Sequence, residues 1–216
     1  MKERPIIFDT WAISKIQDGS KTQTRRLRNL EKINESPNDW VYQGNNLVDN
    51  HYYFYHRDYV GHKSGDAQMI TIHCPYGQVG DVLYIKETWM IEMHSGCYDI
   101  KYKDGKLKDA GSNLYIAAYS HLRNRCGVWR PSIFMPRWAS RIMLEITEVR
   151  AERLQEISEM DAIAEGCNPV NKEWDNSNRS ATFSFHTLWD SINGKKYPWD
   201  NNDWVFPISF KKVQGE

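Results

Sequence analysis

The chain has 216 residues, of which 40% are hydrophobic and 26% are charged, a composition typical of a soluble globular protein. Its 28 Lys and Arg residues balance 28 Asp and Glu residues, so it lacks the basic excess typical of proteins that bind long nucleic acids. No apolar stretch approaches the ~18 residues of a membrane span and no signal-peptide pattern is present, which predicts a cytoplasmic protein without a membrane partner.

The first half of the chain predicts a helix, a strand and a long insertion. The helix is expected over Thr10–Asp18, with its first residue as the cap and Gly19 as the stop. The alternating threonines of Ser20–Arg26 predict a strand. Residues 29–68, rich in Asn, Asp, Gly and Tyr, are expected to be an insertion. Its most aromatic stretch, His51–Arg57, is interpreted either as a β-hairpin that packs on the rest of the fold or as a lid whose rings stack on a base.

The second half of the chain adds strands and two capped helices. Composition and alternation predict strands at Val82–Trp89, Leu114–Tyr119, Ile142–Val149 and Trp204–Val213. In the last of these, Pro207 favours an edge strand or a bulge. Caps and apolar periodicity predict helices at Ser158–Glu165 and Ala181–Asn193. The apolar stripe of the second helix consists of Phe185, Leu188, Trp189 and Ile192.

This order of elements predicts a mainly β (α+β) fold. Several strands, few helices and no regular βαβ alternation favour a small barrel with flanking helices and loops. No composition shift marks a boundary, so we expect a single domain over 1–216, with insertions at about 29–68 and 90–130.

The four cysteines, Cys74, Cys97, Cys126 and Cys167, are widely spaced and form no Cys-x-x-Cys pair. This spacing argues against a zinc ribbon, and cysteines without an export signal are typical of reduced thiols. We therefore expect no metal site. A site that combines Cys74 with His73 or with distant histidines is the alternative.

A polar cluster follows the first helix. On a strand, Thr22, Thr24 and Arg26 share one face, and Lys21 lies at the turn before it. Such a cluster can bind an anion or a carbonyl oxygen, and a neutral lysine can activate a hydroxyl group. Arg25 and Arg26 supply the cationic neighbours that keep a lysine neutral part of the time. The alternative interpretation is a polar strand exposed to water.

Glu165 is expected in the last turn of its helix, where the helix dipole disfavours a negative charge. If it is also buried, a carboxyl group at such a place tends towards a raised pKa, which suits a proton donor. The alternative is a surface glutamate that water stabilises.

A second basic feature lies between Leu122 and Leu144, where the sequence has five arginines and no acidic residue. Trp129 and Trp138 are interleaved with these arginines, which suits a groove for short single-stranded nucleic acid. The alternative is a long loop with arginines on its surface. The arginines are Arg123, Arg125, Arg130, Arg137 and Arg141.

Several of these segments carry a family resemblance. Gly19–Arg26, Gly80–Leu83 and the pair Ile208 and Phe210 resemble the ASCH domain, a family with a PUA-like β-barrel fold. The resemblance implies that barrel fold, which the family shares with RNA-binding and modified-base-reading modules. Three more segments look like the longer ASCH proteins of phages and prophages: Cys74–Gly77, Glu87–Trp89 and Met135–Arg141.

Within that family, bacterial amidohydrolases that deacetylate N4-acetylcytidine carry a similar Lys-Thr-x-Thr-x-Arg motif. The resemblance implies that Lys21 is the proton acceptor, that Thr24 is the nucleophile and that Glu165 is the proton donor, without a metal or another cofactor. The helix start Ile157–Ala162 is similar to the one that precedes the glutamate of those enzymes. We expect further substrate contacts from Thr22, Arg26, Glu87, Trp89, Arg137 and Trp138.

The resemblance thus predicts a hydrolase whose substrate is a small nucleoside or nucleobase with an acyl group on N4. Its partners would be that substrate and, at most, short single-stranded nucleic acid. Two other functions stay open: a non-catalytic module that binds RNA, DNA or a modified base, with Lys21 and Arg26 on phosphates, and a ribonuclease.

Overall fold

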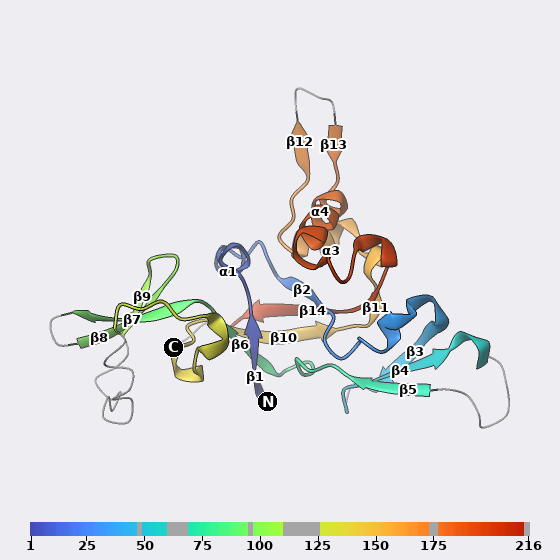
Figure 1. The fold of residues 1–216 in the computed structure, drawn as a ribbon, viewed down its shortest axis with the longest axis horizontal. Helices are drawn as coiled ribbons and strands as arrows, with labels where there is room; N and C mark the ends of the chain where they lie inside the picture. Colours follow the sequence, from blue (N-terminus) through green and yellow to red (C-terminus); the bar gives the residue numbers. More distant parts are fainter. Residues whose placement is uncertain (47–48, 60–68, 95–96, 110–125, 173–176, 214–216) are drawn as a thin grey trace.

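The computed structural model describes residues 1–46, 49–59, 69–94, 97–109, 126–172 and 177–213. Its architecture is mainly β with few α-helices, which confirms the predicted fold class (Figure 1). The predicted strand at Leu114–Tyr119 lies outside the described residues.

A six-stranded sheet forms the centre of the molecule and curls into a half-barrel. The strand order is β1-β6-β10-β14-β11, and β2 pairs with the other edge of β14. β1 runs parallel to β6, and the remaining pairs are antiparallel. The strands are β1 (Glu3–Ile7), β2 (Gln23–Arg26), β6 (Val82–Lys86), β10 (Met143–Val149), β11 (Glu152–Arg153) and β14 (Trp204–Lys212).

The interior position of β14 corrects the interpretation of Pro207 as a sign of an edge strand. β14 pairs with β10 on one side and with β2 on the other, and Pro207 lies opposite Arg25 of β2. A proline is tolerated here because Pro207 lies between the stretch of β14 that pairs with β10, which ends at Ile208, and the stretch that pairs with β11, which begins at Val205, so its missing N–H falls at a break in the ladder. The irregularity in register lies nearby in β10, between Ile146 and Glu148.

Two small sheets flank the central sheet at opposite ends of the molecule (Figure 1). Most of their residues fall within the two segments predicted as insertions, 29–68 and 90–130, but the strand Met69–His73 follows the first of these segments. The predicted strand Val82–Trp89 is divided between β6 and the first strand of the second small sheet. One sheet contains β3 (Trp40–Asn46), β4 (His51–His56) and β5 (Met69–His73), and the other β7 (Trp89–His94), β8 (Cys97–Tyr102) and β9 (Leu107–Asp109).

The aromatic stretch within β4 packs inward, as the hairpin interpretation requires. Tyr52 and Phe54 are fully buried, and their rings meet those of Phe206 and Trp204 of β14 at 4.9 and 5.1 Å. These rings belong to the main hydrophobic core. The interpretation of this stretch as a lid over a ligand is therefore wrong.

Three α-helices and a hairpin lie above the central sheet in Figure 1. Asp9, not Thr10, caps the first helix: its Oδ1 accepts a hydrogen bond from the backbone of Ala12. Ser158 caps the second helix as predicted. The elements are α1 (Thr10–Gln17), α3 (Glu159–Ala164), α4 (Ala181–Asn193), β12 (Val170–Lys172) and β13 (Ser177–Arg179). Short 3-10 helices occupy Ile33–Glu35, Pro37–Asp39, Arg57–Tyr59, Ser132–Phe134, Arg137–Ala139, Leu154–Glu156 and Trp199–Asn201.

α3 and α4 pack on each other and on the outer part of the sheet. Phe185 and Trp189 of α4 are buried in a second hydrophobic cluster with Val205 of β14. Ile192, predicted on the same stripe, is 61% exposed because it lies near the end of the helix, beyond this cluster. This packing places α4 opposite α1, with β2 between them.

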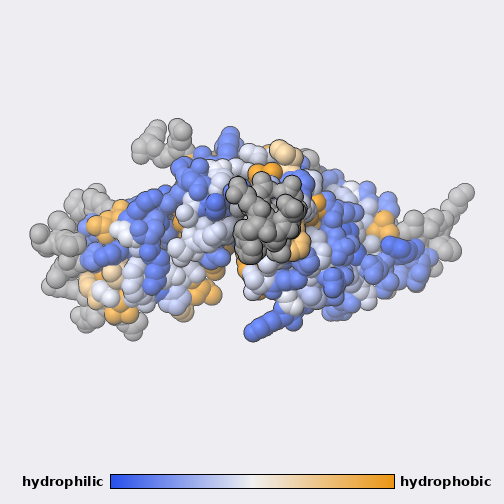
Figure 2. Space-filling view, turned by 90° about the horizontal axis from the view of Figure 1, so that it is seen from above, coloured by the Kyte–Doolittle hydropathy of each residue, from blue (hydrophilic) through white to orange (hydrophobic). Residues whose placement is uncertain are grey.

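The surface seen from above the helices is mainly hydrophilic, and its hydrophobic patches are small (Figure 2). Among the described residues, no helix has the length and apolar character needed to cross a membrane.

Candidate functional site

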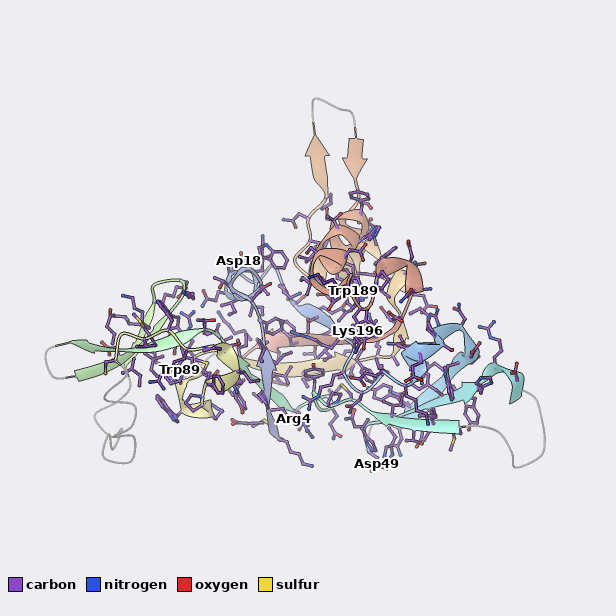
Figure 3. All side chains as sticks on the ribbon, viewed as in Figure 1. Arg4, Asp18, Asp49, Trp89, Trp189 and Lys196 are labelled. Atoms are coloured by element: carbon purple, nitrogen blue, oxygen red, sulfur yellow. The ribbon has the colours of Figure 1, made fainter. Side chains whose placement is uncertain are left out.

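A cavity of about 520 Å³ opens between α1, β2 and α4. Its lining comes from the end of β1, the start of α1, Thr24–Arg26 of β2, the C-cap of α3 and one face of α4. Trp189 and Lys196 are among the lining residues, and Figure 3 places both on the α4 side of the central sheet. Lys21, Thr24, Arg26 and Glu165 also line this cavity, so the fold brings four of the predicted site residues together.

The backbone holds Lys21 and Glu165 opposite each other. The two residues form an isolated antiparallel bridge, and the next nitrogen, of Thr22, donates to the carbonyl oxygen of Ala164 at 2.7 Å. Glu165 is the C-cap of α3, and Gly166 then turns the chain with φ +88°, a conformation that favours glycine. The short helix thus ends where its C-cap residue, Glu165, meets Lys21 just before β2.

The side chains of Lys21 and Glu165 form a buried ion pair. Lys21 Nζ donates to Glu165 Oε2 at 2.6 Å and to the carbonyl oxygen of Glu165 at 2.8 Å. Both side chains are about 5% exposed or less. Because a buried charge is costly unless it is paired, each residue depends on the other for its place in the fold.

Thr24 enters the cavity from β2, where it pairs in register with Ile208 of β14. It is 5% exposed. Within the described residues, both hydrogen bonds of the Lys21 ammonium group go to Glu165, and none goes to Thr24. The arrangement therefore presents a hydroxyl group beside an ion pair that can move a proton internally.

Arg25 departs from its expected role as a neighbour that repels the Lys21 charge. Its side chain is fully buried and faces acidic groups: it lies 2.7 Å from Glu152, 3.3 Å from Glu165 and 3.6 Å from Asp161. The guanidinium group also lies over the ring of Phe185, at 5.5 Å. Alternation along a strand predicts that position 25 points away from position 24, but α3 packs beside β2 and supplies carboxylates on that side.

Arg26 lines the cavity beside aromatic rings. The Arg26 guanidinium group donates to the carbonyl oxygen of Ile7 at 2.9 Å and lies over the rings of Phe8 and Tyr76, at 4.8 and 5.9 Å. Burial lowers the pKa of Arg26 and raises the pKa of the Tyr76 phenol. The aromatic residues that line the cavity are Phe8, Trp11, Tyr76, Phe185, Trp189 and Tyr197.

Sequence reasoning missed that these aromatic rings line one cavity, and it missed the role of Arg25. The rings come from four separate segments, and of these rings only Phe185 and Trp189 belong to a predicted pattern, the apolar stripe of Ala181–Asn193. For Arg25, the available signal was the pair of adjacent arginines after the threonines, which a surface strand would also show.

Five residues predicted to contact the substrate lie outside this cavity. Thr22 lies just before β2 and is exposed. Glu87 is buried and accepts two hydrogen bonds from Arg141, at 2.9 and 2.7 Å. Arg137 makes a similar fork with Glu3 at the surface.

The remaining two residues, Trp89 and Trp138, belong to a separate hydrophobic cluster beneath the small sheet β7-β8-β9. Their rings meet edge to face at 6.0 Å, and Arg130 lies over Trp89 at 5.2 Å. Figure 3 shows Trp89 in that sheet, well apart from Trp189 and Lys196. The packing gives these residues a structural role.

The same contacts bear on the predicted nucleic-acid groove. Arg123 and Arg125 lie outside the described residues. Arg130, Arg137 and Arg141 interact within the protein, with Trp89, Glu3 and Glu87 respectively. These three arginines therefore have less of their charge available to phosphates than the sequence suggested. Among the described residues, no group of three or more His, Cys, Asp or Glu side chains is arranged to hold a metal ion.

Comparison with known proteins yields one distant structural similarity to report. No family model and no curated protein matches the chain. A solved structure of an ASCH domain from Lactobacillus crispatus is similar over 98% of this chain and 79% of its own, with 12% sequence identity and a TM-score of 0.40. A similarity of this degree says nothing about activity.

Proposed function

We propose that the cavity hydrolyses the amide bond of N4-acylated cytosine or cytidine, with Thr24 as nucleophile, Lys21 as proton acceptor and Glu165 as proton donor. The observation that carries this proposal is a buried Lys–Glu ion pair beside a buried threonine in one cavity. The volume of about 520 Å³ falls within the range of small-ligand sites. The Lys-Thr-x-Thr-x-Arg motif, similar to that of N4-acetylcytidine amidohydrolases, supports the same roles.

The ion pair gives the proposed reaction a closed route for the proton. Thr24 Oγ1 bonds to the acyl carbon while its proton goes to Lys21 Nζ, which passes one of its own protons to Glu165 Oε2. The carbon–nitrogen bond then breaks as Glu165 donates that proton to the amine nitrogen of the leaving group. An acyl ester remains on Thr24, and water cleaves it by the same route. Lys21 and Glu165 end in the protonation states in which they started.

The walls of the cavity suit a planar substrate. Trp11, Tyr76 and Tyr197 supply rings on which a pyrimidine can stack. The Arg26 guanidinium group also lines the cavity and can stabilise negative charge that develops on the acyl oxygen. A neutral amide with a flat, delocalised amine as its leaving group fits both features.

A binding module without turnover is the second candidate. Both hydrogen bonds of the Lys21 ammonium group go to Glu165, and such a lysine can serve as a fixed charge. A phosphate held directly at this point is disfavoured, because the Glu165 carboxylate would repel it. Of the non-catalytic functions, this favours recognition of a base over recognition of a nucleic-acid backbone.

The deciding experiment is hydrolysis of a panel of N4-acylated cytosines and cytidines by the purified protein, followed by chromatography of the released base. Turnover that disappears in Thr24→Ala supports the proposal. A folded protein that binds these compounds without cleaving them supports the binding module. Cleavage of single-stranded RNA by the same preparation, abolished by Thr24→Ala, would support a ribonuclease.

A further inference from the structure

We propose that Arg25 is a positioning residue of this site, which fixes the Glu165 carboxylate so that one of its oxygens always faces Lys21. The effect of Arg25 on catalysis rests on the proposed function, whereas its contact with Glu165 is a matter of geometry. The Glu165 carboxylate is held at both oxygens: Oε1 accepts from Arg25 Nη1 at 3.3 Å, and Oε2 accepts from Lys21 Nζ at 2.6 Å. A carboxylate held at both oxygens does not rotate.

Arg25 is itself fixed by groups that take no part in the proposed reaction. Its Nη1 donates to Gln23 Oε1 at 2.7 Å, and its Nη2 donates to Glu152 Oε1 at 2.7 Å. Gln23 in turn donates to Asp161 Oδ1 at 3.0 Å. The chain of contacts therefore runs from β11 and α3 through Arg25 to Glu165. In this arrangement Arg25 acts on the reaction only through Glu165, although it also lines the cavity.

The contact between Arg25 and Glu165 matters because the proton route needs the Glu165 carboxylate to begin as a proton acceptor. Opposite charge nearby stabilises the ionised form of a carboxyl group, and Arg25 adds a second cation to the one from Lys21. The motif Lys-Thr-x-Thr-x-Arg leaves the position of Arg25 unspecified, so the resemblance assigns no role to it. The charged and titratable groups around Glu165 are Lys21, Arg25 and Arg26 from the β2 segment, Lys15 from α1, Cys167 after α3, and Asp161 and Glu152, which share Arg25.

The test compares Arg25→Gln with the matched control Arg150→Gln. Arg150 pairs with Glu152 and Asp161, as Arg25 does, but its ion pairs reach Glu148 instead of Glu165. We expect Arg25→Gln to lower kcat more than it changes KM, and to move the acid limb of the kcat/KM profile to higher pH by about one unit or more. Arg150→Gln should leave the profile in place, and Arg25→Lys should restore part of the shift.

A substrate-free measurement separates this inference from the proposed function. Protein labelled with ¹³C at glutamate carboxyl groups is titrated by NMR, and Glu165→Gln identifies the resonance. In Arg25→Gln that resonance should take up its proton at higher pH than in the wild-type protein, whether or not any acylcytosine is cleaved. Wild-type protein inert towards the whole panel would end the proposed function while this titration still decides on Arg25.

Two outcomes would overturn the inference. One is a folded Arg25→Gln protein, judged by circular dichroism, whose pH profile and carboxyl titration match the wild type. If Arg25→Gln does not fold, Arg25→Lys is used in its place, because lysine keeps the charge but not the guanidinium fork, and the second outcome is then read from this variant. A carboxyl titration of Arg25→Lys that is unchanged from wild type would show that the fork has no positioning role.

Discussion

Lys21 and Glu165 are joined twice, by an isolated backbone bridge between the segment before β2 and the C-cap of α3 and by an ion pair of 2.6 Å between their side chains. The two residues are 144 positions apart in the chain. Because the backbone contact fixes both Cα positions, the side-chain pair forms as part of folding and needs no ligand to assemble it. A site built in this way is pre-organised for chemistry.

The first prediction concerns the three proposed catalytic groups. Lys21→Ala, Thr24→Ala and Glu165→Ala should each lower kcat for an N4-acylcytidine by about a hundredfold or more, because one proton route uses all three. Double variants should lose little more than the single ones, since groups that serve one step fail together. Steady-state kinetics on all variants measures this.

The control for that prediction is Thr24→Ser, which keeps the hydroxyl group and should keep much of the turnover. Independent, additive losses in the double variants would argue against a shared proton route. Since removal of one member of a buried ion pair also destabilises the fold, each variant must be shown to be folded at the assay temperature.

The second prediction separates packing from substrate binding at Glu87. Its carboxylate is buried and held by Arg141, which also bonds to Asp104 at 2.9 Å. Glu87→Ala should lower the free energy of unfolding by about 3 kcal/mol, since it leaves a largely buried arginine with one partner fewer. KM for the acylated substrate should not change. A raised KM at unaltered stability in urea unfolding would instead restore Glu87 as a substrate contact.

Much of the fold follows from local patterns in the sequence. Asn193 ends α4 as predicted, because the apolar stripe ends beside it and Gly194 follows it as the C-cap. Val149 ends β10 as predicted, because alternation fixes which side chains are buried. The two small sheets were harder to foresee, because their strands belong to segments with weak periodicity. Rings such as Tyr52 pack the first sheet on β14, and the second sheet has a hydrophobic cluster of its own around Trp89 and Tyr102.

Some residues of the candidate site could likewise be predicted from the sequence, and others could not. Lys21, Thr24 and Glu165 could be proposed from a motif, because a motif records which residue types occur together in a family. Arg25 could not, since its partners lie on α3 and β11, and pairing between distant segments is invisible in a single sequence. Glu87 and Trp89 matched a motif whose residues the fold uses for packing.

The third prediction tests the turn that presents Glu165. Gly166 has φ +88°, so Gly166→Ala should destabilise the protein by about 1–2 kcal/mol through backbone strain. It should also lower turnover, because the strained residue follows Glu165 directly. Gly105 has a similar φ of +80° in open space in the β8–β9 turn, so Gly105→Ala is the matched control. Equal losses of turnover in both variants would contradict a local effect at the site.

The fourth prediction concerns Asp203, which is fully buried just before β14. Among the described residues, neither of its carboxylate oxygens has a hydrogen-bond partner. Burial raises the pKa of Asp203 from an ordinary 3.8 to about 6, while the charge of Arg153 acts in the opposite direction. The folded protein therefore binds a proton at this carboxyl group more tightly than the unfolded chain does.

The sign of the effect on stability follows from that difference. Between pH 3.8 and about 6 the folded state holds more protons at this position, so this contribution to stability falls as pH rises. Asp203→Asn mimics the protonated group and removes the contribution's pH dependence. The free energy of unfolding of the variant should therefore increase relative to that of the wild type as pH rises, by at most about 3 kcal/mol at pH 7. Urea unfolding from pH 4 to 7 measures this difference in the free energy of unfolding between the two proteins. The effects of other carboxyl groups cancel in the difference. If the difference in free energy of unfolding stays constant over this range, Asp203 titrates alike in the folded and unfolded states.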